Sequence, residues 1–372
     1  MHPRYKKIYS CTPTSFIAPE FFHDRDNGLI SKTLRSMNIE SQCILPLPWK
    51  ENSSRHDIIR TEYKNLESVE WWKNLGLDAV VLYSWGAPKY NKVARAIHKA
   101  GIHLWIHLDS SCNFEGPDWN QLSLLKKIFR YLKVKAVDFF RAQHLKYADT
   151  ITTAKPAAEK LSNRLFYRGW IQDKFEYMPC PVSPAFSYDG TPKQNRILCL
   201  GRWNDVYQKR PEMLMKTLEL LYSKGCTATT YIFGYLTEDI QNWHKNLDSA
   251  ISEKIILKGS VPNAELINEY KAAKIVFNTS LFESSHIVSA EGLCCGCSIV
   301  TPNRPDSLCD LLWYTTQQSG TISTHDTASS LADAITSELN AWETGERDPQ
   351  KIAQKWQPFF HVNQIIHRIF EH

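Results

Sequence analysis

The stretch from Ile275 to Pro302 reads IVFNTSLFESSHIVSAEGLCCGCSIVTP and predicts a strand, a loop, a helix and a second strand, in that order. Ile275–Phe277 and Ser298–Thr301 are short apolar or β-branched runs, typical of strands that are buried on both faces of a parallel sheet. The helix between them ends at Gly296, because glycine readily adopts the left-handed conformation found at helix ends. Open α/β sheets bind ligands outside the carboxyl ends of their strands, so we expect a site in the loop 278–286.

Two carboxylates follow the first of these strands with seven residues between them, Glu283 in the loop and Glu291 in the helix. Ser280 precedes them and Gly296 follows them. This pattern resembles the Glu-x7-Glu signature of the retaining glycosyltransferases with a GT-B fold, especially glycosyltransferase family 4. Ile299 stands where that family has Val.

The stretch departs from the family pattern at three places. Ser284-Ser285-His286 stands where the family favours Gly-Phe-Gly, Gly292 where it favours Ala, and Ser298 where it favours Pro. These departures leave a second hypothesis open, in which the chain is a catalytically inactive GT-B protein that binds a nucleotide or a glycan.

Length and composition favour two α/β domains. A chain of 372 residues suits two domains of about 150 to 200 residues each, and 43% hydrophobic with 22% charged residues is ordinary for a globular protein. The resemblance implies two Rossmann-like doubly wound domains, the GT-B fold, with a cleft between them. We expect an acceptor domain over 1–187, a nucleotide-sugar domain over 188–355, and a helix over 356–372 that packs back on the first domain.

Strands and helices alternate along the first half of the chain, which predicts a parallel sheet covered on both faces. Apolar runs predict strands over 78–83 and 102–107, whereas 57–75 is interpreted as one polar amphipathic helix. Ser183–Asn195 is rich in Ser, Pro, Gly and Asp and is the predicted linker. Near the end of the chain, 348–370 is predicted to form a single helix.

The second domain begins with a predicted strand that leads to Arg202, then a polar loop that leads to Lys209, and then Pro211 at the start of a helix. This order resembles the family's Gly-Arg loop followed by Lys. A leaving nucleotide diphosphate gains negative charge as the glycosidic bond breaks, and a guanidinium and an ammonium aimed at the phosphates stabilise that charge. The resemblance therefore implies catalytic roles for Arg202 and Lys209; the alternative is two solvated side chains of a loop.

Two further candidates lie in the first half of the chain. His107 ends a predicted strand, and the resemblance implies that it faces the donor sugar, where an imidazole can hydrogen-bond a hydroxyl or stabilise charge near the anomeric carbon. The alternative is a structural histidine. Gly28 follows Asn27 at the start of a predicted helix, and the resemblance implies a turn beneath the donor phosphates; a simple helix start is the alternative.

The resemblance also implies how the donor is held. Glu291 would accept hydrogen bonds from the two ribose hydroxyls, and Glu283 would contact hydroxyls of the donor sugar. Backbone amides of Ser285, His286 and Ile287, at the helix start, would point at the diphosphate.

The turn at Val261 would lie at the nucleotide base, which backbone groups would read, so UDP, GDP and dTDP remain open. The implied reaction moves a hexose from a nucleotide diphosphate sugar to an acceptor hydroxyl, with retention and through an oxocarbenium-like transition state, in polysaccharide or glycoconjugate synthesis. The expected partners are this donor and a glycan or lipid-linked acceptor, with no further cofactor and no metal. A sugar-nucleotide epimerase would need further acid–base carboxylates and a phosphorylase a pyridoxal lysine on a longer chain, and neither is indicated.

Leu122–Lys146 is predicted to be a long basic helix on which Leu125, Phe129 and Leu132 recur at helical spacing. We favour an ordinary packing helix with a solvated charged face. The alternative is peripheral contact with anionic lipid.

Charge and hydropathy exclude some other classes. The net charge of +5 suits anionic ligands such as nucleotide diphosphates and is too weak to indicate nucleic acid. Neither a secretory signal nor an apolar run of about 18 residues is present, so we expect a cytoplasmic protein, with peripheral contact at the inner face of a membrane as the alternative. The ten cysteines are then expected to be reduced, and Cys294, Cys295 and Cys297 to pack at a helix end rather than bind a metal.

Overall fold

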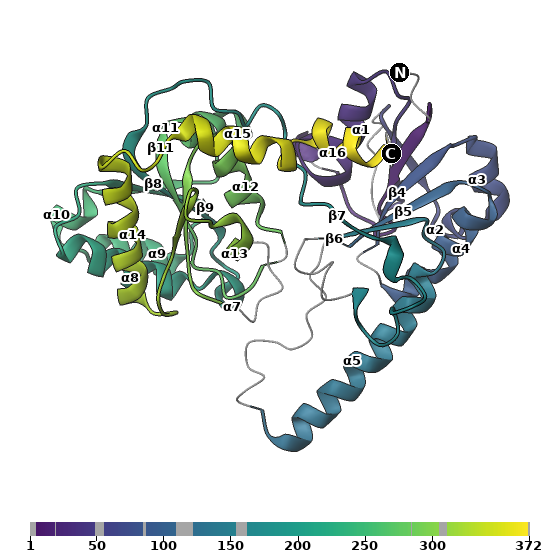
Figure 1. Cartoon of the computed structure of the whole chain (residues 1–372), viewed down its shortest axis with the longest axis horizontal. Coiled ribbons are helices and arrows are strands. Elements are labelled where there is room, and N and C mark those ends of the chain that lie inside the picture. The colour runs from purple at the N-terminus through teal and green to yellow at the C-terminus, as the bar shows by residue number, and fades with distance from the viewer. Residues whose placement is uncertain are drawn as a thin grey trace. The chain divides into compact units, whose positions relative to one another are not determined.

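The computed structural model describes residues 5–18, 20–48, 56–84, 87–108, 122–153, 162–283, 285–304 and 311–370. The chain divides into two compact units, drawn in Figure 1. Unit 1 comprises residues 1–183 and 362–372, and unit 2 comprises residues 184–361. Ser284, the first residue of the departure from the family pattern, lies outside the described residues.

Unit 1 is built on a parallel sheet of seven described strands in the order β3-β2-β1-β4-β5-β6-β7. The central strand β4 is buried at every position, as its apolar sequence AVVLY predicts. The strands are β1 (Ile8–Cys11), β2 (Cys43–Pro46), β3 (Ile58–Thr61), β4 (Ala79–Tyr83), β5 (His103–Leu108), β6 (Thr150–Thr153) and β7 (Phe175–Tyr177).

Helices cover both faces of this sheet. The α-helices are α1 (Asp26–Ser36), α2 (Tyr63–Leu66), α3 (Val69–Leu75), α4 (Asn91–Lys99), α5 (Leu124–Leu145) and α16 (Val362–Phe370), and the 3-10 helices are η1 (Glu20–Asp24), η2 (Pro88–Tyr90) and η4 (Gln172–Lys174). Local signals delimit several of them. For example, the Ser68 side chain accepts a hydrogen bond from the Trp71 amide at the start of α3, and Gly76 ends that helix in the left-handed conformation.

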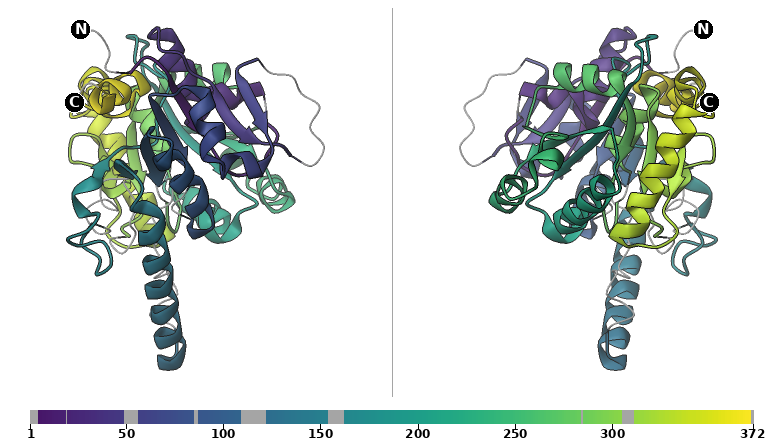
Figure 2. Two further views of the ribbon diagram at one scale, coloured as in Figure 1. Left: turned by 90° about the vertical axis from the view of Figure 1, so that its right-hand side faces the viewer. Right: turned by 90° about the vertical axis from the view of Figure 1, so that its left-hand side faces the viewer.

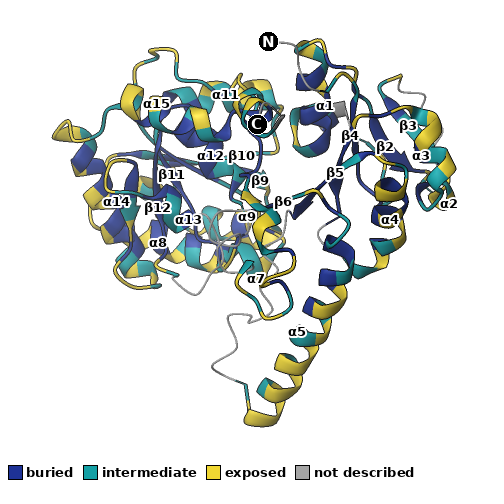
Figure 3. Ribbon diagram, turned by 45° about the vertical axis from the view of Figure 1, so that its right-hand side comes forward, coloured by how far each residue is buried: buried dark blue, intermediate teal, exposed yellow. Residues whose placement is uncertain are grey.

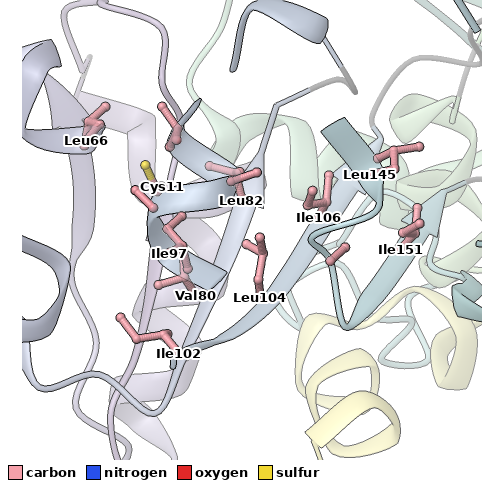
Figure 4. Close-up of a cluster of buried hydrophobic side chains, with 14 of the residues drawn as sticks. Cys11, Leu66, Val80, Leu82, Ile97, Ile102, Leu104, Ile106, Leu145 and Ile151 are labelled. Atoms are coloured by element: carbon pink, nitrogen blue, oxygen red, sulfur yellow. The ribbon is translucent and has the colours of Figure 1, made fainter. Parts of the chain in front are cut away.

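The core of unit 1 lies on the two faces of its sheet. Figure 4 shows one side, where Val80 and Leu82 of β4 and Leu104 of β5 pack with Ile97 of α4 and Leu145 at the end of α5. On the other side, Leu29 and Leu34 of α1 belong to one apolar cluster with Val362, Ile365 and Ile366 of α16. The last helix of the chain is therefore part of unit 1.

Unit 2 repeats this plan with a parallel sheet of six described strands in the order β10-β9-β8-β11-β12-β13. The strands are β8 (Gln194–Arg202), β9 (Thr229–Tyr235), β10 (Ile255–Gly259), β11 (Ala273–Phe277), β12 (Ser298–Thr301) and β13 (Gly320–Ile322). The stretch that opened the sequence analysis supplies β11 and β12, paired in parallel with Val276 opposite Ile299.

The helices of unit 2 again lie on both faces, as Figure 2 shows from two sides. Leu214 and Leu218 of α8 and Leu331 and Ile335 of α14 belong to the main core cluster, while α12 contacts α11, α15 and the strands β11 and β12. The helices are α7 (Val206–Lys209), α8 (Pro211–Ser223), α9 (Glu238–Lys245), α10 (Ser249–Ser252), α11 (Asn263–Ala272), α12 (Ile287–Cys294), α13 (Leu311–Tyr314), α14 (Ala328–Glu343) and α15 (Pro349–Phe360). The prediction of two doubly wound parallel α/β domains is confirmed.

The end of the chain differs from its predicted form. Residues 348–370 form two helices, α15 and α16, because His361 between them is extended and its Nε2 lies 3.0 Å from the Phe186 carbonyl oxygen. In α15, Trp356 stacks on Phe360 and the Gln357 side chain donates to the Cys294 carbonyl of unit 2. The division therefore falls after His361, whereas the sequence placed it before Trp356.

Two other elements correct the sequence interpretation. Residues 57–75 are not one helix: Ile58–Thr61 form β3, the edge strand paired with β2, and two short helices follow. In α5, the apolar stripe of Leu125, Phe129 and Leu132 is exposed rather than packed, so the favoured interpretation of an ordinary packing helix is wrong. No helix in the part of the chain that the structure describes is long and apolar enough to cross a membrane.

Candidate functional site

The strand β8 ends at the candidate Arg202, and the short helix α7 that follows carries the candidate Lys209. The Asp205 side chain accepts a hydrogen bond from the Gln208 amide at the start of α7, and Arg210 ends the helix in the left-handed conformation with φ 50°. Pro211 then begins α8, as the sequence predicts. This tight turn holds Gln208 and Lys209 in a fixed place at the edge of the sheet.

Backbone contacts join this turn to the loop that follows β11. The Leu281 amide donates to the Gln208 carbonyl at 2.8 Å, and the Thr279 hydroxyl donates to the Lys209 carbonyl at 2.7 Å. The two segments lie some seventy residues apart in sequence, so only the pairing of β8 with β11 brings them together. The loop that carries Glu283 is thereby set against the turn that carries Lys209.

Lys209 and Glu283 form a nearly buried ion pair at this junction. The Lys209 ammonium contacts Glu283 Oε1, and the two side chains are 12% and 9% exposed. The side-chain nitrogen of Gln208, Nε2, donates to Glu283 Oε2 at 3.0 Å and to the Phe282 carbonyl at 3.1 Å. Both carboxylate oxygens of Glu283 are therefore engaged by side chains of the α7 turn.

The electrostatics of the pair follow from its burial. Burial by itself would raise the pKa of Glu283, but the charge and the hydrogen bond of the Lys209 ammonium oppose it, and the pKa lies below its ordinary value. Burial also lowers the pKa of His286 to about 4, which leaves its imidazole uncharged at neutral pH. The Lys209 ammonium is then the charge that keeps Glu283 ionised.

Arg202, the other predicted cation, lies at the rim of this cluster. Its side chain is 72% exposed, and its Nη2 lies 3.4 Å from Gln208 Oε1 and 3.6 Å from Asp205 Oδ2. Gln208 thus bridges Arg202 to Glu283. Lys209 therefore contacts Glu283 directly in a buried pair, whereas Arg202 reaches it only through Gln208 and is open to solvent.

Sequence reasoning missed a second charged cluster at the same edge of the sheet. Arg210 makes two hydrogen bonds to the Asp326 carboxylate, at 2.7 and 2.9 Å, and Arg304 adds a third at 2.9 Å. These guanidiniums lower the pKa of Asp326 against the opposing effect of burial. The Arg210 Nε also donates to the Thr279 carbonyl at 2.6 Å, which ties this cluster to the loop after β11. Arg210 follows Lys209 directly, but nothing in the sequence signals a partner more than a hundred residues away.

A pocket opens between the loop after β11 and the segment after β12. Glu283 lines it from the first and Arg304 from the second, with Ser280, Thr301 and Pro302 between them. Its lining combines a carboxylate, a guanidinium and hydroxyl groups.

The start of α12 holds three of the predicted ligand-binding residues. His286 precedes the helix and is 3% exposed, with Nδ1 2.7 Å from the Ser289 hydroxyl and Nε2 3.8 Å from Glu283 Oε1. The Ser285 hydroxyl lies 3.0 Å from that of Tyr314. Ile287 is the first residue of the helix, and amides at such a start lack partners within the helix and suit an anion.

Glu291 lies inside α12 and is 5% exposed. One of its carboxylate oxygens accepts a hydrogen bond from the Tyr270 hydroxyl at 3.0 Å. Burial and the nearby carboxylate raise the pKa of Tyr270, so the phenol remains a donor. Val261, predicted to lie at the base, is half-buried in the turn between β10 and α11.

The two candidates in unit 1, His107 and Gly28, are both packed closely against neighbouring elements of that unit. His107 is buried near the carboxyl end of β5, with Nδ1 3.0 Å from the Thr152 hydroxyl. Burial lowers its pKa to about 3, so the imidazole is neutral and offers hydrogen bonds rather than charge. Gly28 lies in the first turn of α1, where an added Cβ would fall 2.1 Å from the Phe22 carbonyl oxygen. The close approach of η1 therefore requires glycine at this position.

Cysteines and acidic residues provide no metal centre here. Among the described residues, no group of three or more His, Cys, Asp or Glu side chains is placed to hold a metal ion. Cys294, Cys295 and Cys297 are buried, and burial raises the pKa of each thiol. Asp24 and Asp26 have the spacing of an Asp-x-Asp motif, but burial raises the pKa of Asp26 and it interacts with the Cys180 thiol.

A family model matches the region that contains this geometry. Residues 194–340, from β8 into α14, match the model of the family Glycosyl transferases group 1. The resemblance to the group 1 glycosyltransferases is confirmed. The matched region contains Arg202, Lys209, Glu283 and Glu291, so the clusters described above lie within it. No curated protein sequence matches the chain.

Solved structures match the fold of the chain over both units. The apo form of the lipopolysaccharide outer core galactosyltransferase WaaB is 15% identical, with a TM-score of 0.63, and the match covers 98% of this chain and 99% of that one. WaaG, a glycosyltransferase involved in lipopolysaccharide biosynthesis, is 13% identical with a TM-score of 0.64 and coverage of 98% and 100%. Anabaena Alr3699/HepE in complex with UDP-glucose is 13% identical with a TM-score of 0.61 and coverage of 98% of each chain. At these identities the matches establish the GT-B fold.

Proposed function

We propose that this chain is a retaining, metal-independent hexosyltransferase that moves a sugar from a nucleotide diphosphate sugar to an acceptor hydroxyl, in polysaccharide or glycoconjugate synthesis. The observation that carries the proposal is the nearly buried contact between Lys209 and Glu283 at the edge of the group 1 domain. Structural neighbours bound to UDP and UDP-glucose support a nucleotide-sugar donor, although at low identity.

In this mechanism the diphosphate displaces part of the existing ion pair. The Lys209 ammonium moves its hydrogen bonds from the Glu283 carboxylate toward the phosphate oxygens, and Arg202 closes over them from its exposed position. The two cations then stabilise the charge that develops on the leaving group. Glu283, released from Lys209 and still held by Gln208, accepts hydrogen bonds from hydroxyls of the donor sugar.

The remaining candidates bind and orient the donor. The amides at the start of α12 face the diphosphate, and Glu291 accepts from the ribose hydroxyls beside its contact with Tyr270. The base lies at the turn of Val261. In unit 1, Gly28 and His107 remain candidates for contacting the donor, with His107 as a neutral hydrogen-bonding group. The enzyme would work where nucleotide sugars are made, in the cytoplasm.

The test is incubation with UDP-, GDP- and dTDP-sugars and measurement of nucleoside diphosphate release. The variant Lys209→Ala should lower the rate by about a hundredfold to a thousandfold, the range for loss of one preorganised electrostatic contact. Lys216→Ala is the matched control, because Lys216 forms an exposed pair with Glu212 on α8 of the same unit. Equal rates for the two variants would refute the assigned role of Lys209.

A second candidate function is binding of a nucleotide or glycan without turnover. It is favoured by His286, a fully buried imidazole 3.8 Å from Glu283 at a position where the family has glycine. Titration calorimetry with UDP and UDP-sugars separates the two: binding that Lys209→Ala weakens, without release of nucleoside diphosphate for any donor and acceptor, supports this second function.

A further inference from the structure

The first two-thirds of α5 expose large apolar side chains to solvent. Leu125 is 80% exposed, Phe129 73% and Leu132 59%. Figure 3 shows exposed residues along most of this helix and buried ones only near its end, and Figures 1 and 2 show it extending away from the rest of unit 1. Monomeric soluble proteins rarely leave such contiguous apolar surface uncovered.

These side chains form a stripe on the side of α5 that faces away from its packing contacts. A helix turns about 100° per residue, which places Leu125, Phe129 and Leu132 together with Phe140 on one side. The buried residues Asp138, Arg141 and Leu145 lie on roughly the opposite side. The stripe therefore belongs to a different face from the one that packs in unit 1.

The same part of the helix is strongly basic. Five cations and no acidic residue lie between Leu124 and Val137, and the cations are Lys126, Lys127, Arg130, Lys133 and Lys135. Asp138, the only acidic residue of α5, is held by the Arg164 guanidinium at 2.8 Å and lies 3.3 Å from the Tyr167 hydroxyl. Asp138 is therefore paired with Arg164 from outside α5 and does not offset the five cations of the helix.

We propose that this face of α5 lies on a lipid bilayer with anionic headgroups. The helix axis would run parallel to the surface, with Leu125, Phe129 and Leu132 inserted among the acyl chains. Lys126 and Lys133 border the stripe and would reach the headgroups with their charged ends. The helix lies on the membrane rather than crossing it, because α5 is not apolar enough to span a bilayer.

The combination of stripe and charge selects lipid among the possible partners. An acidic polypeptide would pair with the lysines but leave the apolar stripe in water. A second copy of this chain would cover the stripe but bring five more cations against the first five. An anionic bilayer satisfies both features at once. The proposal does not depend on the proposed activity, because lipid binding is measured without any donor.

The experiment is flotation of the full chain with phosphatidylcholine vesicles, with and without phosphatidylglycerol. We expect binding to the mixed vesicles that salt weakens. Leu125→Ser/Phe129→Ser should lower the partition coefficient at least tenfold, and Lys126→Gln/Lys133→Gln about tenfold or more, since each cation near an anionic surface contributes about a factor of five. All four side chains are largely exposed, so circular dichroism should match the unaltered chain.

Matched controls come from exposed residues elsewhere in unit 1. Ile17→Ser removes an apolar side chain that is 68% exposed, and Lys73→Gln/Lys99→Gln removes two exposed charges. Neither should alter partitioning. The proposal is overturned if the mixed vesicles fail to bind the chain, or if the Leu125→Ser/Phe129→Ser variant binds them as well as the controls do. It is also overturned if that variant converts a dimer to a monomer without changing vesicle binding, or if soluble polyglutamate holds the chain as tightly as the vesicles.

Discussion

The two units have the same parallel architecture but opposite chemistry at the carboxyl ends of their strands. In unit 2 this edge is charged, with Lys209 on Glu283 and Arg210 on Asp326. In unit 1 the described residues at this edge include neutral imidazoles, with buried His107 beside the Thr152 hydroxyl and Ser84, just after β4, 2.8 Å from His144 Nε2. Burial keeps the imidazoles uncharged, whereas ion pairing keeps the carboxylates ionised despite burial. The comparison teaches that burial has opposite outcomes for the two kinds of group: it leaves a histidine neutral, whereas a carboxylate paired with a cation keeps its charge.

The largest expected effect comes from breaking the charged edge. Glu283→Ala leaves the Lys209 ammonium nearly buried without its partner, which should lower the free energy of unfolding by about 3 kcal/mol or more. Urea unfolding followed by circular dichroism measures this. Lys209→Met/Glu283→Leu should regain most of the loss, since an apolar pair has no charge to desolvate. A cost below about 1 kcal/mol for Glu283→Ala would show that the pair is solvated.

Replacing one glycine in each unit by alanine compares how closely the backbone and side chains pack around it. Gly28→Ala should cost about 3 kcal/mol, because its Cβ would fall 2.1 Å from a backbone oxygen of η1 that cannot move aside freely. Gly292→Ala in α12 should cost less, about 1 to 2 kcal/mol, since its Cβ would fall 2.6 Å from a methyl carbon of the buried Val276 side chain, while alanine favours the helix. Thermal unfolding of both variants ranks them, and the reverse order would refute the close approach of η1 and α1.

The neutral edge should make stability depend on pH between 7 and 5. A histidine with a folded-state pKa of about 3 or 4 binds its proton more weakly than the unfolded chain, which has a pKa near 6.5. Its contribution to stability is therefore complete at neutral pH and is lost as the pH falls below 6.5, by about 2 kcal/mol per histidine at pH 5.

Variants assign this dependence to residues. His107→Asn should remove about 2 kcal/mol of the difference between pH 7 and pH 5 in urea unfolding. Glu283→Gln should leave the difference unchanged, because the pKa of Glu283 is lowered from 4.5 and the carboxylate stays ionised over this window. A pH-independent free energy of unfolding would contradict the buried, neutral state of His107.

The smallest effect is expected at the rim of the charged edge. Arg202→Ala should change the free energy of unfolding by less than about 0.5 kcal/mol, because the side chain is 72% exposed and its contacts are long. The same variant should weaken UDP binding in titration calorimetry. A variant that loses stability but retains UDP affinity would make Arg202 a structural residue.

Much of the fold was predictable from local patterns. The apolar runs of β4, β11 and β12 could only be buried strands, and Gly296 ends the segment after α12 with φ 76°. Edge strand β3 was missed because Ile58 and Ile59 are followed by Arg60 and polar residues, and half of the strand remains partly exposed. A partly exposed edge strand carries a weaker pattern than a central one.

The sequence nominated residues of the candidate site but not their contacts. The spacing of Glu283 and Glu291 and the order of Arg202 and Lys209 pointed to the region of unit 2 in which Lys209 contacts Glu283. No sequence pattern showed that Lys209 pairs with Glu283 itself, that Gln208 bridges Arg202 to that carboxylate, or that Asp326 gathers two arginines. These partners lie between six and more than a hundred residues apart, and their meeting depends on strand order.

The amino-acid sequence by itself determined the two parallel sheets, the turn chemistry around Pro211 and the basic, apolar repeat of α5, because each follows from neighbours a few residues away. Only the tertiary structure decided which charges neutralise one another, that the terminal helices separate at His361, and that the stripe of α5 is uncovered. Those outcomes depend on which elements pack side by side, and burial, unlike periodicity, is set by the whole fold.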